Sequence, residues 1–366
     1  TASINGGGMY NGNSANSVVT NCIFYGNSNA IINGLGGAVN VNYSLMQGGF
    51  AGTGNLNADP LFINAPSGDY RLQSGSPAIN TGSNAALPAN DTTDLAGNPR
   101  IVDAIVDLGA YEYQHAVVPD ANGVLYVDST VASPGNGSSW APALDSLGTA
   151  LSAATTNTNI KQIWVAKGTY QPESGQSFAM VKGVQIYGGF AGTETSLSQR
   201  DLTAGNPSIL KGNGARVIYK NNNGLTSAAM LDGFTITGGP ATLGGGGMYN
   251  NSVSPAIANC IFSENSTSGG GGGGGMYNTN ASPVITDCTF SGNIVTGSGN
   301  TGGGMDNESS SSPTIISCIF SGNKAAYIND GSGGGGGIWN DQSTPTLINC
   351  IFSGNIAGTS GTASYG

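Results

Sequence analysis

The sequence predicts an all-β protein built as a parallel β-helix, a solenoid whose coils stack along one axis. The first observation is a motif that occurs five times, around Gly6–Asn27, Gly244–Asn265, Gly269–Asn293, Gly302–Asn323 and Gly333–Asn355. Each copy has a glycine run, a Met-Tyr-Asn-like triplet, an alternating segment, a cysteine and Phe-x-x-Asn. The motif returns after roughly 30 residues, a spacing typical of stacked repeats. The composition, with 62 glycines and 8% charged residues, fits neither a charged disordered chain nor collagen, which needs a strict three-residue period.

The segment 312–323 illustrates how one coil is expected to fold. Its alternation places Thr314, Ile316, Cys318 and Phe320 on one face of a strand, with Ile315 and Ile319 on the other. Gly322 and Asn323 accept left-handed backbone angles, which predicts a turn after the strand. We therefore expect two or three short strands in each coil, hydrogen-bonded to the next coil at a spacing of about 4.8 Å.

Two motif positions are expected to form columns along the solenoid. The cysteine position holds Cys22, Cys260, Cys288, Cys318 and Cys350. The last position of Phe-x-x-Asn holds Asn27, Asn265, Asn293, Asn323 and Asn355. We interpret the cysteines as a ladder of small buried side chains and the asparagines as a turn ladder of hydrogen-bonded amides. Disulfides between neighbouring coils remain an alternative, although an odd number of cysteines cannot pair completely.

The order of the elements suggests a permuted repeat unit. Residues 1–113 resemble the last coils and the end of one β-helix, and residues 114–123 are expected to be a linker. Residues 124–366 begin with a strand, followed by a helical pattern near 142–154 that would cap the first coil. We expect Gly366 to continue into Thr1 of the next copy, because the motif at Gly333–Asn355 leads directly to the motif at Gly6–Asn27.

The charge pattern argues against two classes of partner. Ten basic residues against twenty acidic ones give a net charge of −10, and no basic stripe is present to bind nucleic acid. No run of 18 apolar residues occurs, so we expect no membrane span.

The sequence offers no clear catalytic constellation. The single histidine, His115, lies in the expected linker, and the pair Asp306 and Glu308 fits a solvated bend. A denser group of acids, Asp91, Asp94, Asp103, Asp107 and Glu112, could hold Ca²⁺, although its spacing matches no EF-hand loop. We therefore predict no catalytic residue, no cofactor and no metal site, and expect that the protein is not an enzyme.

Several segments resemble known bacterial surface proteins. The turns Phe24–Asn27, Phe262–Asn265, Phe290–Asn293, Phe320–Asn323 and Phe352–Asn355 are similar to the repeats of polymorphic outer membrane proteins. Trp164–Tyr170, Tyr187–Glu194, Ser74–Asn80 and Asp94–Arg100 resemble the right-handed parallel β-helix domains of large secreted proteins of Bacteroidota-like bacteria. The resemblance covers nearly the whole chain and implies a right-handed parallel β-helix that is secreted and adhesive or structural.

The function expected from these observations is mechanical. We expect a non-catalytic structural unit of an extracellular, secreted or cell-surface fibre or stalk, whose partners are copies of itself stacked head to tail. The first alternative is a carbohydrate-binding adhesin, in which Tyr25, Tyr277, Trp339 and Tyr365 could contact glycans if they face outward. The second alternative is a polysaccharide-degrading β-helix enzyme, which would need paired carboxylates on one surface.

Overall fold

The computed structural model describes residues 7–12, 14–33, 36–102, 105–131, 134–203, 205–221, 224–269, 271–296, 302–325, 334–358 and 364–365. The chain forms two compact units, and each is described by itself. Unit 1 comprises Thr1–Ala116 with Ala132–Gly135, and unit 2 comprises Val117–Val131 with Asn136–Gly366. The division between Ala116 and Val117 falls inside the segment 114–123.

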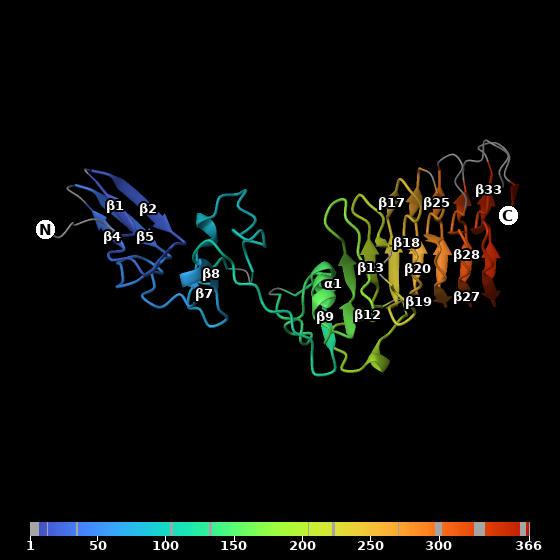
Figure 1. Ribbon diagram of the computed structural model, residues 1–366, viewed down its shortest axis with the longest axis horizontal. Helices are drawn as coiled ribbons and strands as arrows, with labels where there is room; N and C mark the ends of the chain where they lie inside the picture. The colour runs from blue at the N-terminus through green and yellow to red at the C-terminus, as the bar shows by residue number, and fades with distance from the viewer. Residues whose placement is uncertain are drawn as a thin grey trace. The chain divides into compact units, whose positions relative to one another are not determined.

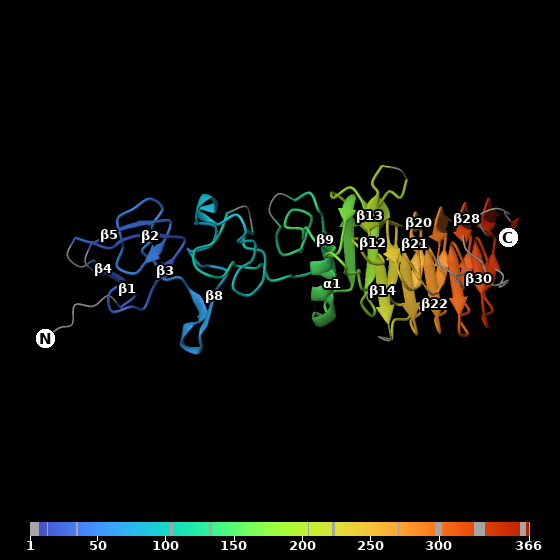
Figure 2. The same ribbon diagram turned by 90° about the horizontal axis from the view of Figure 1, so that it is seen from above.

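Unit 2 is a stack of coils whose strands form four sheets parallel to the stacking axis (Figures 1 and 2). The first sheet contains β9 (Val124–Val127), β10 (Gln162–Ala166), β12 (Gln185–Phe190), β15 (Met230–Asp232), β19 (Ala256–Ala258), β23 (Val284–Thr286), β27 (Thr314–Ile316) and β31 (Thr346–Ile348). The second contains β11 (Gly168–Tyr170), β13 (Ser208–Lys211), β16 (Phe234–Thr237), β20 (Ile261–Ser263), β24 (Thr289–Ser291), β28 (Ile319–Ser321) and β32 (Ile351–Ser353).

The third and fourth sheets complete the coils. The third contains β14 (Ile218–Asn221), β18 (Met248–Asn251), β22 (Met276–Thr279), β26 (Met305–Glu308) and β30 (Ile338–Asn340). The fourth contains β17 (Pro240–Ala241), β21 (Ser266–Thr267), β25 (Ile294–Val295), β29 (Lys324–Ala325), β33 (Ile356–Ala357) and β34 (Ser364–Tyr365). Most interior coils therefore have four strands, one more than expected, because strands of two residues are too short to show an alternating pattern.

Neighbouring coils pair in parallel and in register, so equivalent motif residues lie above one another. Phe262 pairs with Phe290, and Phe320 pairs with Phe352. The exception among the described strands of this unit is β34, which is antiparallel to β33. The interior is one continuous apolar cluster that extends from Leu125 to Phe320. Stacking thus gives each coil the core that it could not form alone.

The predicted faces of the segment 314–320 are wrong for half of its residues. Ile315, Cys318 and Phe320 are buried, whereas Thr314 and Ile316 lie half-exposed. The reason is Ser317, whose φ of 52° puts a left-handed corner between β27 and β28. This corner interrupts the strand and shifts the phase of the alternation. The odd-numbered Ile315 faces inward before the corner, and the even-numbered Cys318 and Phe320 face inward after it.

The glycine run before each Met-Tyr-Asn triplet has two separate causes. Gly273 has a φ of 72°, which L-amino acids with a side chain rarely adopt. Gly275 packs so closely that an added Cβ would lie 2.6 Å from the Gly304 carbonyl oxygen and 3.0 Å from the Phe290 ring. The run therefore supplies both a bend and the space for the neighbouring aromatic ring.

The helix α1 (Leu147–Thr156) covers the β9 end of the core. It begins five residues later than the predicted start near 142, because Leu144 forms a β-bridge with Val127 and Ser146 caps the helix. Its buried residues Leu147, Ala150, Leu151 and Ala154 join the same cluster as Leu125. Within the described residues, no helix is long and apolar enough to cross a bilayer. A short 3₁₀ turn, Leu197–Gln199, follows β12.

Unit 1 has a smaller set of parallel pairs followed by irregular chain. The pairs are β1 (Met9–Asn11) with β4 (Ile31–Asn33), β2 (Asn16–Thr20) with β5 (Ala38–Asn42), and β3 (Ile23–Phe24) with β6 (Leu45–Met46). The antiparallel hairpin β7 (Phe62–Asn64) and β8 (Asp69–Leu72) encloses the 3₁₀ turn Ala65–Ser67, and a second turn lies at Asn84–Ala86. Ile23 and Phe62 pack with buried Leu45 and Leu108, so the irregular chain covers the outer face of the β3–β6 pair.

Candidate functional site

The asparagines of unit 2 form a continuous buried ladder. Asn265 Nδ2 donates to Asn293 Oδ1 at 3.1 Å, and the same bond joins Asn293 to Asn323 and Asn323 to Asn355 at 2.9 Å. Each Nδ2 also donates to a carbonyl oxygen of the preceding coil, and each backbone N–H of the first three donates to the next Oδ1. The side chains thus join neighbouring coils where the backbone turns.

The cysteines of unit 2 also lie in one column, as free thiols. The backbone N–H of Cys260 donates to Cys288 Sγ at 3.4 Å, and the N–H of Cys288 donates to Cys318 Sγ at 3.4 Å. Burial raises the pKa of the Cys288 thiol well above its ordinary value. A thiol held in its protonated form is a poor nucleophile, so Cys288 acts as a packing residue in this column.

Cys22 and Asn27 lie in unit 1, apart from these ladders. The backbone N–H of Cys22 donates to Ser44 Oγ at 3.2 Å, so the next rung there is a serine. Cys22 is half-buried, as is Asn27, and burial raises the pKa of the Cys22 thiol. The structure therefore brings together four of the five residues of each predicted column and places the fifth in the other unit.

Two further ladders were missing from the sequence interpretation. The third residue of the Met-Tyr-Asn triplet forms one, with Asn250, Asn278, Asn307 and Asn340 joined by bonds of 2.8–2.9 Å. Asn11 donates to Asn33 in unit 1 in the same way, at 3.0 Å. The motif phenylalanines form the other, with ring centroids 4.7–4.9 Å apart. Both ladders could have been predicted from the sequence, because the same residue, asparagine or phenylalanine, recurs at one motif position in successive coils.

The acidic group in unit 1 holds backbone N–H groups. Glu112 accepts from the N–H groups of Val102 and Asp107, and its carboxylate lies 3.4 Å from the guanidinium of Arg100. Asp94 accepts from Ala96, Asn98 and Glu112. Asp103 lies outside the described residues. In the described part of the chain, no three or more His, Cys, Asp or Glu side chains are grouped to hold a metal.

The outward aromatic residues of the third sheet stack on one another. Tyr219, Tyr249 and Tyr277 have ring centroids 5.3 Å apart along the stack, and the Arg216 guanidinium lies 4.7 Å from the Tyr249 centroid. The Tyr277 hydroxyl donates to Glu308. Trp339 is half-buried in β30, and the Tyr365 side chain lies outside the described residues. His115 contacts the ring of Tyr113.

The last described coil of unit 2 exposes residues that are buried in every coil before it. Phe352 is 46% exposed, whereas the equivalent Phe320 is 0% exposed. Leu347 is likewise exposed at the position where Ile315 is buried. Strands β30, β31 and β32 each lie at the end of their sheet, with a ladder partner on one side only among the described strands. This face, comprising β30, β31 and β32, is called the distal edge below.

The first coil of unit 1 has a corresponding unpaired edge. Strands β1, β2 and β3 each belong to a two-stranded sheet, with β4, β5 and β6 as the single described partners. This face is called the proximal edge below. It carries Met9, Asn11, Cys22, Phe24 and Asn27, at the motif positions that Ile338, Asn340, Cys350, Phe352 and Asn355 occupy in the last described coil.

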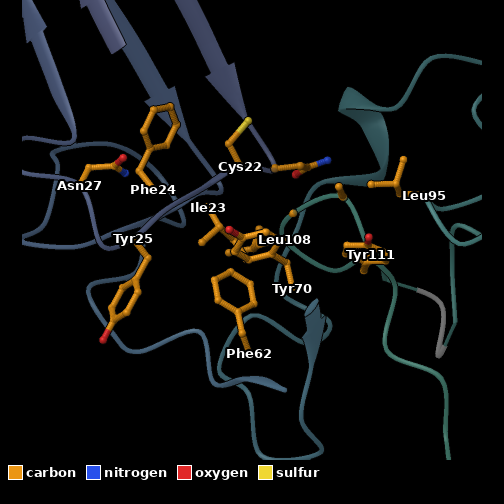
Figure 3. Close-up of a pocket in the computed structure, with 13 residues that line it drawn as sticks. Cys22, Ile23, Phe24, Tyr25, Asn27, Phe62, Tyr70, Leu95, Leu108 and Tyr111 are labelled. Carbon is orange, nitrogen blue, oxygen red and sulfur yellow. The ribbon is translucent and has the colours of Figure 1, made fainter. Parts of the chain in front are cut away.

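A cavity of about 690 Å³ lies at the proximal edge, beside β3 (Figure 3). Its wall is mainly aromatic and aliphatic, and Asn21 and Asn27 are the amide side chains that line it. The apolar lining residues are Ile23, Phe24, Tyr25, Phe62, Tyr70, Leu95, Leu108 and Tyr111. Figure 3 shows Ile23, Phe62, Tyr70 and Leu108 gathered on one side of the β3 chain, with Cys22 and Phe24 on the other.

These features define a class of protein: a β-solenoid stabilised by internal side-chain ladders, with a coil edge on each unit that has no further partner among the described strands. A family model described as a right-handed beta helix region matches residues 178–365, which is just over half of the chain. The chain belongs to this right-handed β-helix family. Comparisons with curated proteins and with solved structures give no significant match.

Proposed function

We propose that this chain is a non-catalytic structural unit of an extracellular fibre or surface stalk, in which copies stack head to tail. The observation that carries the proposal is the distal edge, where core residues of the repeat are exposed. Leaving this apolar surface in water costs free energy that one more coil would recover. The occupant is a second copy, because the proximal edge presents the next coil of the same motif.

The register inside unit 2 shows how two copies would join. Ile319 pairs with Ile351, and Phe320 pairs with Phe352. One further step in this register places Ile351 against Ile23 and Phe352 against Phe24 of the second copy. The same step places Asn355 against Asn27 and Asn340 against Asn11. Both asparagine ladders and the phenylalanine stack would then continue from one copy into the next.

The acidic residues support a structural function. In the described part of the chain, Asp94 and Glu112 hold backbone groups of unit 1, and Glu308 accepts a bond from Tyr277. Glycoside hydrolysis requires two carboxylates that flank a substrate on one surface. Carboxylates committed to structural bonds in separate places do not provide this arrangement.

The test is the molar mass of the 366-residue chain across a concentration series, measured by light scattering with negative-stain microscopy. We expect multiples of 36.4 kDa and filaments at high concentration. Phe352→Asp should return the chain to single copies, whereas Ile261→Asp, an exposed position on an interior coil, should not. A chain that stays at 36.4 kDa at every concentration would refute the proposal.

Thiol labelling gives an independent measurement of the same joint. Cys260, Cys288 and Cys318 are buried, whereas Cys22 and Cys350 are half-buried, one at each unpaired edge. Dilute chain should therefore label at two cysteines, and concentrated chain at fewer. Labelling that does not change with concentration would count against stacking.

A carbohydrate-binding adhesin is the second candidate, and the aromatic cavity of unit 1 is the observation that favours it. Aromatic faces are common sugar platforms, but binding also needs convergent polar groups. The tyrosines of the third sheet favour it less, because their faces are covered by one another. Isothermal titration with soluble oligosaccharides, comparing the chain with Tyr70→Ala, tests this candidate.

A further inference from the structure

We propose that the cavity beside β3 is a receptor for the outward-facing side chain Ile351 of a second copy of this chain. This inference rests on the proposed head-to-tail stacking and adds to it a specific contact that interior coils lack. It makes the cavity part of a protein–protein joint, with the distal edge of one copy seated on the proximal edge of another.

The cavity lies beside β3, a strand with one described ladder partner. The strand β3 pairs with β6 on one side and has no described ladder partner on the other. Its inward residue Phe24 packs in one apolar cluster with Cys22, which directly precedes the strand, and its outward residue Ile23 packs in another. Residues from both clusters line the cavity, so the cavity extends across the free edge of β3.

The wall of the cavity on the outward side of β3 is apolar. Leu108 is fully buried beneath the cavity, and Phe62 and Tyr70 form a ring pair with centroids 5.3 Å apart. At Gly109, which has a φ of 97°, an added Cβ would lie 3.0 Å from Ile23 Cδ1. The absence of a side chain at Gly109 therefore lets the backbone of this segment approach the side chain of Ile23 at the floor of the cavity.

The distal edge supplies an occupant of matching chemistry. The strand β32 consists of Ile351, Phe352 and Ser353, and all three are exposed. Ile351 is 56% exposed, more than Ile319 at 38% in the coil before it. Added to β3 in the register of the interior coils, β32 would direct Phe352 inward onto Phe24. Ile351 would then point outward, beside Ile23 and toward Leu108, Phe62 and Tyr70.

Within the described part of the chain, the interior coils have no apolar wall beside their outward isoleucines, unlike the proposed joint between copies. The outward isoleucines Ile261 and Ile319 occupy the equivalent position on β20 and β28, and both remain exposed at the surface of unit 2. The irregular chain of unit 1 provides an apolar wall at this position, as shown by the packing of Ile23. The joint between copies would therefore bury an outward isoleucine that coil stacking alone leaves in water, and this contact would favour self-recognition over any other open β-edge.

The experiment compares the same substitution at two equivalent positions in the full chain. Ile351→Asp and Ile319→Asp are each tested for self-association by sedimentation velocity, with thermal unfolding as a check on folding. We expect Ile351→Asp to weaken association about tenfold or more, as is typical of a buried anchor residue, and Ile319→Asp to leave it unchanged. Tyr70→Ala, on the receptor side, should weaken it in the same way.

The outcomes separate this inference from the proposed function. If Phe352→Asp abolishes association while Ile351→Asp and Tyr70→Ala do not affect it, copies stack but the cavity is not the receptor, and the inference is wrong. If the unmodified chain does not associate, the proposed function fails as well. If protection of the cavity does not depend on chain concentration, the contact is intramolecular and the inference is wrong. If an oligosaccharide binds tightly and Tyr70→Ala removes this binding, the cavity is a glycan site and the inference is also wrong.

Discussion

At the scale of single residues, buried asparagine adds side-chain bonds to the backbone pairing that joins one coil to the next. A buried amide without partners is unfavourable, and a ladder removes this cost because each rung supplies both donors and acceptors to its neighbours. Asn293 illustrates the point: it donates to Phe262 O and Asn323 Oδ1, and accepts from the Nδ2 and N–H groups of Asn265. The rungs are therefore interdependent, and a defect in one leaves groups on both sides unpaired.

Replacing Asn293 with alanine should destabilise unit 2 strongly. The substitution removes the acceptor of the buried Asn265 N–H and of one Asn265 Nδ2 bond, and the amide that donates to the Phe262 carbonyl, at about 1–3 kcal/mol for each group left unsatisfied. We expect a loss of about 3 kcal/mol in the free energy of unfolding, measured by denaturant titration. Asn122→Ala, at an exposed position in the turn before β9, is the matched control and should change it by less than about 0.5 kcal/mol.

The stability of unit 1 should depend on pH through Glu112. Burial is the main cause that raises the pKa of this carboxyl from its ordinary value to about 7, against the opposing effect of N–H donors. The folded state therefore holds the proton more tightly than the unfolded state, and the stabilisation is complete below about pH 4.5. It should decrease as the pH rises through 7. Thermal unfolding of Glu112→Gln, followed between pH 4.5 and 8, should lack this decrease; an unchanged slope would contradict the assignment.

At the scale of elements, a left-handed corner organises each coil of the repeat. Asn21, Asn259, Asp287, Ser317 and Asn349 precede the five cysteines, and all have φ between 51° and 55°. Asparagine, aspartate and serine tolerate this region better than bulky residues do, because their short polar side chains can bond locally. The corner separates the first sheet from the second and sets which residues face inward.

Ser317 permits a test of the corner that separates backbone strain from core packing, because its side chain is exposed. Ser317→Val should destabilise unit 2 by about 1–2 kcal/mol, since a β-branched residue is strained at this φ. Ser317→Gly should cost little or be slightly stabilising. Ser321→Val, the same exchange inside strand β28, should have a small effect because β-branched residues fit strands. Equal losses at both positions would mean that backbone strain is not the cause.

At the scale of the whole molecule, stability should vary with position along the coil stack. Interior strands such as β27 and β28 have ladder partners on both sides, whereas β31 and β32 of the distal edge have one partner each among the described strands. Opening an edge coil exposes little additional surface, because its residues are already exposed. Local opening therefore needs less free energy there than in the interior.

Hydrogen exchange read by mass spectrometry should reveal this gradient. In dilute chain we expect the amides of β31 and β32 to exchange at least tenfold faster than those of β27 and β28. Raising the chain concentration should slow exchange at the distal edge and in β3, since stacking would give both a second ladder partner. Exchange that is uniform along the stack would contradict the expected gradient.

The sequence by itself determined the solenoid and the repeat. Four consecutive copies of a motif, from Gly244 to Asn355, require a stacked architecture, because one coil cannot bury its interior side alone. The same logic located the asparagine position of Asn265, Asn293, Asn323 and Asn355, since equivalent residues in equivalent coils lie above one another. The helix near 142–154 was predicted, but with a start that is five residues too early, because a β-bridge at Leu144 competes with the helical pattern.

Only the tertiary structure decided what faces inward and what meets across the irregular chain. The left-handed corner at Ser317 changes the phase of the alternation, so the alternation alone assigns the wrong residues to the interior. The cavity beside β3 combines residues as distant as Ile23, Tyr70 and Leu108. These come from a strand, a hairpin and an irregular segment without a repeat, and their proximity depends on how the chain after β6 packs on the β3–β6 pair. Repetition makes local structure readable from sequence, whereas a contact formed once, between unlike segments, has no pattern to reveal it.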